Sequence, residues 1–130
     1  MFKSIEIPEA VVDYLLERFD NRMFEATEAY VLKSICKWLD EQDCNYFKVH
    51  GSMFQRAGEP DLIGAINYKG YSISFNFEVK SPKGKPTRLQ VHRLQQWRQV
   101  GNLAGVVRSV DDVINLLDNH IEDNYRDKSH

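Results

Sequence analysis

The chain has 130 residues, of which 42% are hydrophobic and 28% are charged, so we expect one folded domain with its own core and not a disordered protein. No apolar run is long enough to cross a bilayer, and the first residues lack the apolar core of a secretory signal, so we expect a cytoplasmic protein. Cys36 and Cys44 stand apart, without the spacing of a zinc site, which favours reduced thiols.

The net charge of −2 hides a strong asymmetry along the chain. Residues 1–47 hold ten acidic and five basic side chains, whereas residues 79–110 hold seven basic side chains and no acidic one. Such a basic block suits a phosphodiester backbone, but many blocks of this kind are only the solvated face of a helix. The sequence alone leaves both interpretations open.

Two helices are expected in the N-terminal third. The first begins near Pro8, which suits an early helical position, and we expect residues 1–22 to pack or to dimerise through it. The second extends from the N-cap Thr27 to about Asp40. Glu28, in its first turn, either complements the helix dipole or reaches a metal site. The expected buried stripes are Val11, Val12, Leu15, Leu16 and Phe19 in the first helix, and Ala29, Leu32, Ile35, Cys36 and Leu39 in the second.

Three consecutive strands are expected next. The first is Tyr46–His50, and two further apolar runs are joined by Asn67 to Gly70, which is typical of a hairpin. If Lys69 and Gly70 form the turn, Tyr68 faces Tyr71. The same register then places Asp61 opposite Glu78, so two carboxylates from different strands meet.

The last part of the chain alternates helix and strand. Residues 81–86 are rich in proline and glycine and predict a turn. A helix follows from Thr87 to Val100, with Leu89, Leu94 and Trp97 facing inward. A buried strand over residues 103–108 and a last helix from Ser109 complete the domain, and residues 123–130 are expected to fray. The predicted buried stripe of the last helix is Val113, Ile114, Leu116, Leu117 and Ile121.

This order, α-α-β-β-β-α-β-α, predicts an α/β (α+β) fold with a mixed central sheet: an antiparallel meander, then a crossover helix to a further strand. Within it, Lys80 shares a face with Glu78, because side chains alternate across a strand. Two carboxylates in proximity repel each other, and a hard cation such as Mg²⁺ or Mn²⁺ removes that conflict. The lysine can orient or deprotonate an attacking water, or neutralise a phosphate.

Pro60-Asp61 followed by Glu78-Val79-Lys80 resembles the PD-(D/E)xK nuclease motif, which is short and degenerate on its own. The residues around it, Gly58 to Leu62 before and Ser81 to Gln90 after, resemble the VRR-NUC family of these nucleases. The resemblance covers about residues 28–117 and implies a restriction-endonuclease-like core. One departure is Glu59 before the proline, either an additional ligand or an exposed charge.

The resemblance also implies a role for individual residues. It implies that Asp61, Glu78 and the carbonyl of Val79 bind the metal, that Lys80 is catalytic, and that Glu28 and Gln90 lie around the site. Gln90 could hold the attacking water or the lysine, or it could be an ordinary exposed helix residue. The residues expected to grip the DNA backbone are Lys83, Lys85, Arg88 and Arg93.

The expected function is metal-dependent, structure-selective hydrolysis of DNA. Stand-alone members of this family are typically small viral or bacterial proteins, so the resemblance implies a homodimer that cuts branched DNA such as four-way (Holliday) junctions in a bacterial or phage-infected cell. Two alternatives stay open: a monomeric nuclease of flaps or single strands, and a non-catalytic DNA-binding protein with the same fold.

Overall fold

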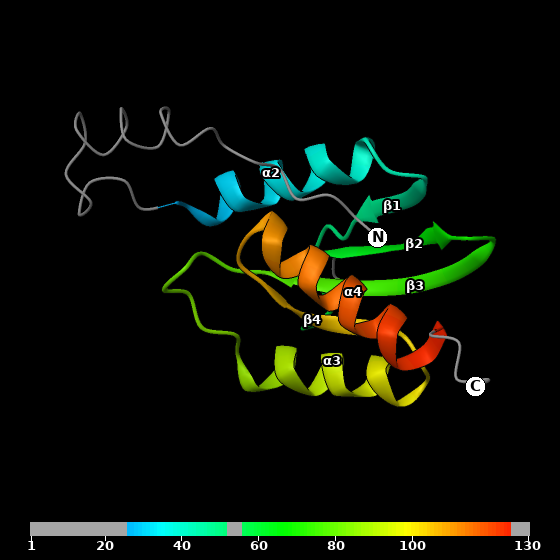
Figure 1. Cartoon of the computed structure of the whole chain (residues 1–130). Helices are drawn as coiled ribbons and strands as arrows, with labels where there is room; N and C mark the ends of the chain where they lie inside the picture. The colour runs from blue at the N-terminus through cyan, green and yellow to red at the C-terminus, as the bar shows by residue number, and fades with distance from the viewer. Residues whose placement is uncertain (1–25, 52–55, 126–130) are drawn as a thin grey trace, which may run out of the picture.

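The computed structural model describes residues 26–51 and 56–125, and the helix expected within residues 1–22 lies outside them. The described residues form three helices and four strands (Figure 1). In chain order these are α2 (Glu28–Asp40), β1 (Cys44–Lys48), β2 (Leu62–Tyr68), β3 (Tyr71–Val79), α3 (Arg88–Gln99), β4 (Leu103–Val107) and α4 (Val110–Tyr125). None of these helices combines the length and the apolar character that crossing a membrane requires.

The strands form one mixed sheet in the order β1-β2-β3-β4. β1, β2 and β3 are an antiparallel meander, and β4 pairs in parallel with β3. A parallel neighbour needs a crossover connection, and α3 provides it. The mixed sheet predicted from the order of the elements is therefore confirmed.

The hairpin between β2 and β3 has the predicted register. Lys69 and Gly70 have φ angles of 50° and 88°, the left-handed conformation that a two-residue hairpin turn requires. Tyr68 pairs with Tyr71, and the register continues to the pair of Leu62 with Phe77. One step further along the strands, Asp61 lies opposite Glu78.

The two faces of the sheet are covered differently. Alternate residues of β3, from Ile73 to Val79, are buried in the main core with side chains of α2 and α4. The intervening residues face the side of α3, which packs on β3 and β4, and they include the buried Asn76 and Glu78. Tyr46 of β1 faces α2, where its hydroxyl donates to Asp40 Oδ1 at 2.7 Å.

Some predicted positions differ from the structure. In α2 the buried stripe includes Val31 and Trp38, whereas Ala29 is exposed because it lies on the opposite side of the helix. Leu89 of α3 is 40% exposed and does not face the core. Its side chain is instead so close to Gly58 that a Cβ there would lie 2.6 Å from the Leu89 Cγ.

The ends of two elements also differ from prediction. β1 begins at Cys44 and ends at Lys48, two residues before the predicted end at His50. α4 continues to Tyr125, so residues 123–125 are helical and are not part of a frayed tail. The Tyr125 ring lies 4.9 Å from that of Tyr71, and this contact with the hairpin stabilises the last turn.

Candidate active site

Asp61, directly before β2, is held by hydrogen bonds from the segments on both sides of it. Its Oδ2 accepts a hydrogen bond from the Val79 N–H at 2.8 Å, and its backbone carbonyl accepts one from the Val49 N–H at 2.7 Å. The carboxylate is thereby fixed against the end of β3. The predicted meeting of Asp61 with the Glu78 to Lys80 segment is present.

Glu78 is a carboxylate buried beside another carboxylate. Its residue is 2% exposed, and its Oε1 lies 3.4 Å from the Lys80 Nζ. Its Oε2 accepts no hydrogen bond from the described part of the chain. Burial and the nearby Asp61 raise the pKa of Glu78 to about 8, although Lys80 acts in the opposite direction. A group beside Glu78 that carries positive charge would remove this conflict.

The backbone carbonyl of Val79, next to Asp61 and Glu78, is a third oxygen that could bind a cation. The Val79 N–H points toward β2, and within a strand the N–H and carbonyl of one residue point to the same neighbour. Continuing the register by one more step places Pro60 opposite Val79, and proline has no N–H to donate. The Val79 carbonyl therefore lacks its usual ladder donor at the position where Asp61 and Glu78 meet.

These three oxygen donors fit a hard divalent cation. Mg²⁺ prefers oxygen ligands and is often held by one or two carboxylates, with water and substrate phosphate completing its shell. In residues 26–51 and 56–125 no group of three or more His, Cys, Asp or Glu side chains is placed to hold a metal. A cation here would be held by Asp61, Glu78 and the Val79 carbonyl, and its remaining ligands would be water or phosphate.

Glu28 does not join this group. It is exposed in the first turn of α2, a helix that packs with the core on the other side of the sheet. Its position suits the positive end of the helix dipole, which is the simpler of the two expected roles.

Gln90 has a structural task at the start of α3. Its Oε1 accepts from the Thr87 N–H at 2.9 Å, and the Thr87 Oγ1 accepts from the Gln90 N–H at 3.1 Å. This reciprocal pair is a capping box, so the amide oxygen is committed to the helix end. The pattern of Thr followed three residues later by Gln could have revealed it from the sequence.

Glu59 is neither an exposed charge nor an available ligand. Its side chain is 13% exposed, and its Oε1 accepts two hydrogen bonds from Arg56, the shorter at 2.7 Å. Its Oε2 accepts from the Trp97 indole N–H at 3.1 Å, and the Arg93 Nε lies 3.6 Å from Oε1. Glu59 therefore ties the turn before Asp61 to α3, and no local sequence signal revealed these distant partners.

Apart from Lys80, the basic side chains of residues 79–110 divide into two groups. Arg93, Arg98 and Arg108 donate to backbone carbonyls: Arg93 to Ala57 at 2.9 Å and Arg98 to Ala104 at 2.8 Å. Arg108 donates to the carbonyls of the 81–84 turn. These three guanidinium groups hold the fold together, so Arg93 is less available to DNA than expected.

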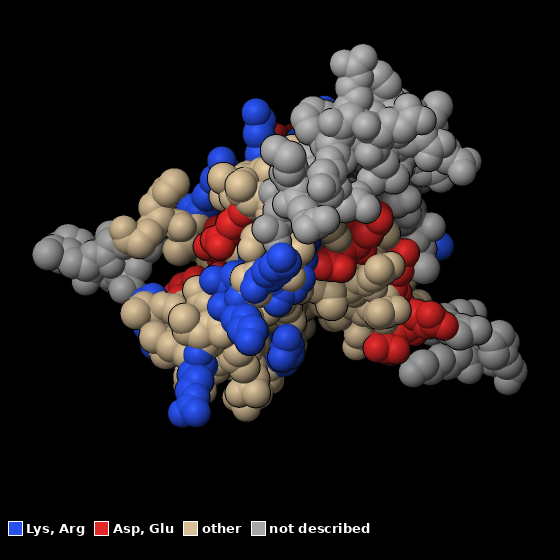
Figure 2. Space-filling view, turned by 90° about the vertical axis from the view of Figure 1, so that its left-hand side faces the viewer, with Lys and Arg blue, Asp and Glu red and all other residues tan. Residues whose placement is uncertain are grey.

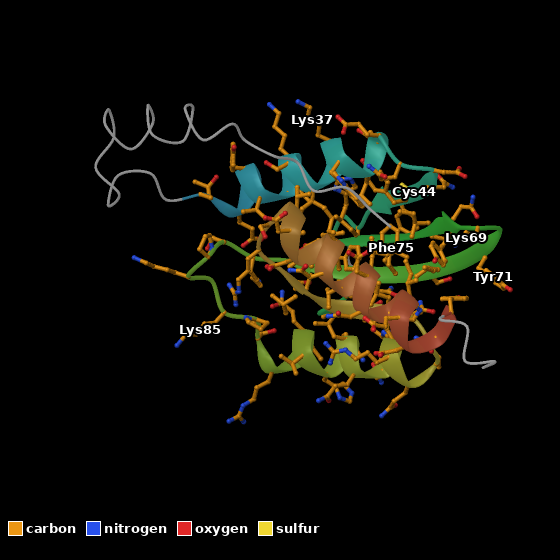
Figure 3. The ribbon with its side chains drawn as sticks, in the orientation of Figure 1. Lys37, Cys44, Lys69, Tyr71, Phe75 and Lys85 are labelled. Atoms are coloured by element: carbon orange, nitrogen blue, oxygen red, sulfur yellow. The ribbon has the colours of Figure 1, made fainter. Side chains whose placement is uncertain are left out.

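The second group is exposed: Lys83, Lys85 and Arg88 lie in or next to the connection between β3 and α3. Lys85 projects from one end of the molecule, and the hairpin residue Tyr71 marks the other end (Figure 3). Lys and Arg side chains gather on the Lys85 end, with acidic side chains on either side (Figure 2). The exposed cations therefore follow directly after the strand that carries Glu78.

The fold of this chain is similar to that of a solved structure. No family model and no curated protein matches this sequence. A solved structure described as "VRR_NUC domain protein" superposes on it with a TM-score of 0.57 and 22% identity, over 75% of this chain and 90% of that one. The two proteins share a fold. The predicted α+β architecture is thereby confirmed, and the roles of individual residues stay predictions.

Proposed function

We propose that the protein is a metal-dependent deoxyribonuclease whose active site is formed by Asp61, Glu78 and Lys80. The observation that carries the proposal is the buried Oε2 of Glu78, which has no hydrogen-bond partner among the described residues although its carboxyl group lies beside that of Asp61. A fold has no need for a buried carboxylate in this setting, whereas a cation-binding site does. The likeness in fold to a VRR_NUC domain protein supports the same proposal.

Each residue has a chemical task in phosphodiester hydrolysis. Asp61, Glu78 and the Val79 carbonyl would hold Mg²⁺ or Mn²⁺, and the ion would polarise the phosphate and lower the pKa of a water. Lys80, whose side chain is 12% exposed, orients that water or stabilises charge on the phosphate. A P–O bond forms to the water oxygen, the P–O bond to one sugar oxygen breaks, and the proton that the water gives up ends on the leaving sugar oxygen.

The exposed cations position the DNA. Lys83, Lys85 and Arg88 contact phosphates of the strand that enters the site, and Arg93 supports the Gly58 turn from α3. Phosphate contacts fix the position of a protein on DNA but carry no sequence information. We therefore propose that the enzyme selects a DNA structure and not a base sequence.

The proposed substrate is branched DNA. The resemblance of the motif residues supports a homodimer on four-way junctions, since a two-fold dimer supplies two sites for two symmetric cuts. A monomeric flap or single-strand nuclease is the second candidate. It is favoured by an exposed aromatic side chain, Phe47, on the face of the sheet that carries Asp61.

Cleavage of labelled four-way junction, flap, single-stranded and duplex DNA tests the proposal, with Mg²⁺, Mn²⁺ or EDTA. Wild type is compared with Lys80→Ala and with Lys69→Ala, which removes an exposed lysine at the hairpin. We expect metal-dependent cleavage that is lost in Lys80→Ala and kept in Lys69→Ala. Paired nicks in the junction support the dimer, and cutting confined to flaps or single strands supports the second candidate. DNA binding without cleavage in either metal contradicts the nuclease assignment.

A further inference from the structure

The sheet is not covered evenly on the side of α3. That helix packs on β3 and β4, and Figure 1 shows it beside β4, at the opposite edge of the sheet from β1. On this side β1 presents Phe47, because the preceding Tyr46 faces α2. Phe47 is 58% exposed and pairs with Ile63 of β2, which is half-buried. A large aromatic side chain is therefore open to solvent on the same face as the carboxylates.

Phe47 is also close to Asp61. The Val49 N–H donates to the Asp61 carbonyl at 2.7 Å, which continues the β1–β2 register by one residue. Phe47 is two residues before Val49, so it is the diagonal neighbour of Asp61 on one face. Diagonal neighbours lie roughly 7–8 Å apart, within reach of an aromatic side chain. A strand whose phosphate lies at Asp61 has an adjacent base near this ring.

The surroundings of Phe47 suit a base better than a phosphate. The next row of residues across the sheet on this face is Asn45, Ala65 and Ser74, which are small or neutral. Lys48, the exposed lysine next to Phe47, points to the opposite face of the sheet, and the exposed Lys83, Lys85 and Arg88 lie in or next to the connection after β3. Single exposed apolar residues are common on protein surfaces. Phe47 is a candidate for base binding because it lies beside the carboxylates.

We propose that Phe47 is a stacking platform for an unpaired nucleobase next to the phosphate that is cut. The proposal rests on the proposed nuclease activity and favours its second candidate substrate, flaps or single strands, in which the nucleotide at the cleavage position is unpaired. Bases of an intact duplex are stacked inside the helix and do not offer a face to a protein ring without being flipped out. Stacking on an aromatic side chain tolerates any base, which agrees with structure-selective cutting.

The test measures binding without cleavage. Fluorescence anisotropy in EDTA gives the affinity of wild type, Phe47→Ala and Phe47→Trp for a single-stranded oligonucleotide and for a duplex of the same sequence. Tyr71→Ala is the matched control, because Tyr71 is also 58% exposed but lies at the hairpin. We expect Phe47→Ala to weaken single-strand binding about 5- to 100-fold, to change duplex binding little, and to be rescued by Phe47→Trp. Tyr71→Ala should bind both DNAs like wild type.

A second arm removes the base instead of the ring. An abasic position at the matching nucleotide should weaken wild-type binding and add no further loss in Phe47→Ala, because the two changes remove one contact. Equal losses for both DNAs, or no loss for either, overturn the proposal, provided that thermal unfolding shows Phe47→Ala to be folded. Unchanged DNA affinity with an altered sedimentation coefficient would assign this surface to contact between copies.

These outcomes are separate from those of the nuclease test. If Phe47 contributes to single-strand binding but no DNA is cleaved with metal, the stacking proposal stands and the nuclease proposal fails. If DNA is cleaved but Phe47→Ala binds like wild type, the nuclease proposal stands and the stacking proposal fails. If wild type binds no DNA, both proposals fail.

Discussion

Two neighbouring residues of β3, Phe77 and Glu78, are both almost fully buried, on opposite faces of the sheet. Phe77 belongs to an apolar core in which its ring stacks on that of Phe75 at 4.7 Å. Glu78 lies on the α3 side, where its Oε2 and the Nδ2 of the buried Asn76 have no hydrogen-bond partner in the described part of the chain. One face is arranged to stabilise the fold, whereas the other keeps polar groups whose burial costs stability.

The largest effect on stability should come from the apolar face. Phe77→Ala removes a ring that is fully buried and should lower the free energy of unfolding by about 3–5 kcal/mol. Urea unfolding followed by circular dichroism measures it. Tyr71→Ala, which truncates an exposed ring of the same strand, is the control and should cost far less. Similar losses for the two variants would mean that the core does not lie where the structure places it.

Glu78→Gln should raise the free energy of unfolding when metal is absent, whereas Phe77→Ala lowers it. Glu78 has a pKa of about 8 in the folded state and an ordinary pKa in the unfolded chain. Between about pH 5 and pH 8 the native state holds a proton that the unfolded state has lost, so stability falls as the pH rises. Glutamine keeps the shape without the charge and should remove this loss, which is on the order of a few kcal/mol at pH 8.

Urea unfolding of both proteins in EDTA at several pH values checks the prediction. Added Mg²⁺ should restore stability to wild type at pH 8 and leave Glu78→Gln unchanged, because the cation takes the place of the proton. If the free energy of unfolding changes with pH in the same way for both proteins in EDTA, the raised pKa of Glu78 is contradicted.

A smaller effect is expected at the turn that holds Asp61. Glu59→Gln removes the charge that Arg56 and Arg93 contact and should destabilise the protein by about 1–3 kcal/mol. DNA cleavage should fall as well, since the turn positions Asp61 against β3. Unfolding and cleavage assays with Glu41→Gln, an exposed acid, as the control separate this effect from a general loss of negative charge. Activity that rises in Glu59→Gln would exclude a positioning role.

The smallest change in stability is expected for variants of Gln90, and they show whether this residue only caps α3 or also acts on the attacking water or Lys80. Gln90→Ala breaks the capping box and should cost about 1 kcal/mol, whereas Gln90→Glu can keep the box and should be nearly neutral. If capping is the whole role, cleavage by Gln90→Glu equals that of wild type. A large loss of cleavage in a stable Gln90→Glu would show that the amide also acts on water or Lys80.

The sequence predicted the parts of the site that local rules govern. Lys69 and Gly70 indicated a two-residue hairpin turn. Pairing Tyr68 with Tyr71 across that turn then fixed the register that places Asp61 opposite Glu78. The alternating arrangement of helices and strands likewise predicted the mixed sheet. Both inferences needed only residues that are near one another in the chain or paired by the hairpin.

Contacts between distant segments could not be predicted in this way. Glu59 meets Trp97, and Arg108 meets the carbonyl of Ser81, through side chains whose chemistry allows many other partners. Arg93 was therefore assigned to DNA when its guanidinium group binds Ala57 and faces Glu59. The position of Glu28 likewise depends on how α2 packs, which its own sequence does not determine.

The proposed metal site is tested most directly by titrating the metal-free protein with Mn²⁺ in an isothermal calorimeter, using wild type, Glu78→Gln, Asp61→Asn and the exposed control Asp111→Asn. We expect wild type and Asp111→Asn to bind the ion with equal affinity, and both site variants to lose most of that binding while remaining folded. Equal binding by all four proteins, or no binding by wild type with or without DNA, would contradict a metal site at Asp61 and Glu78.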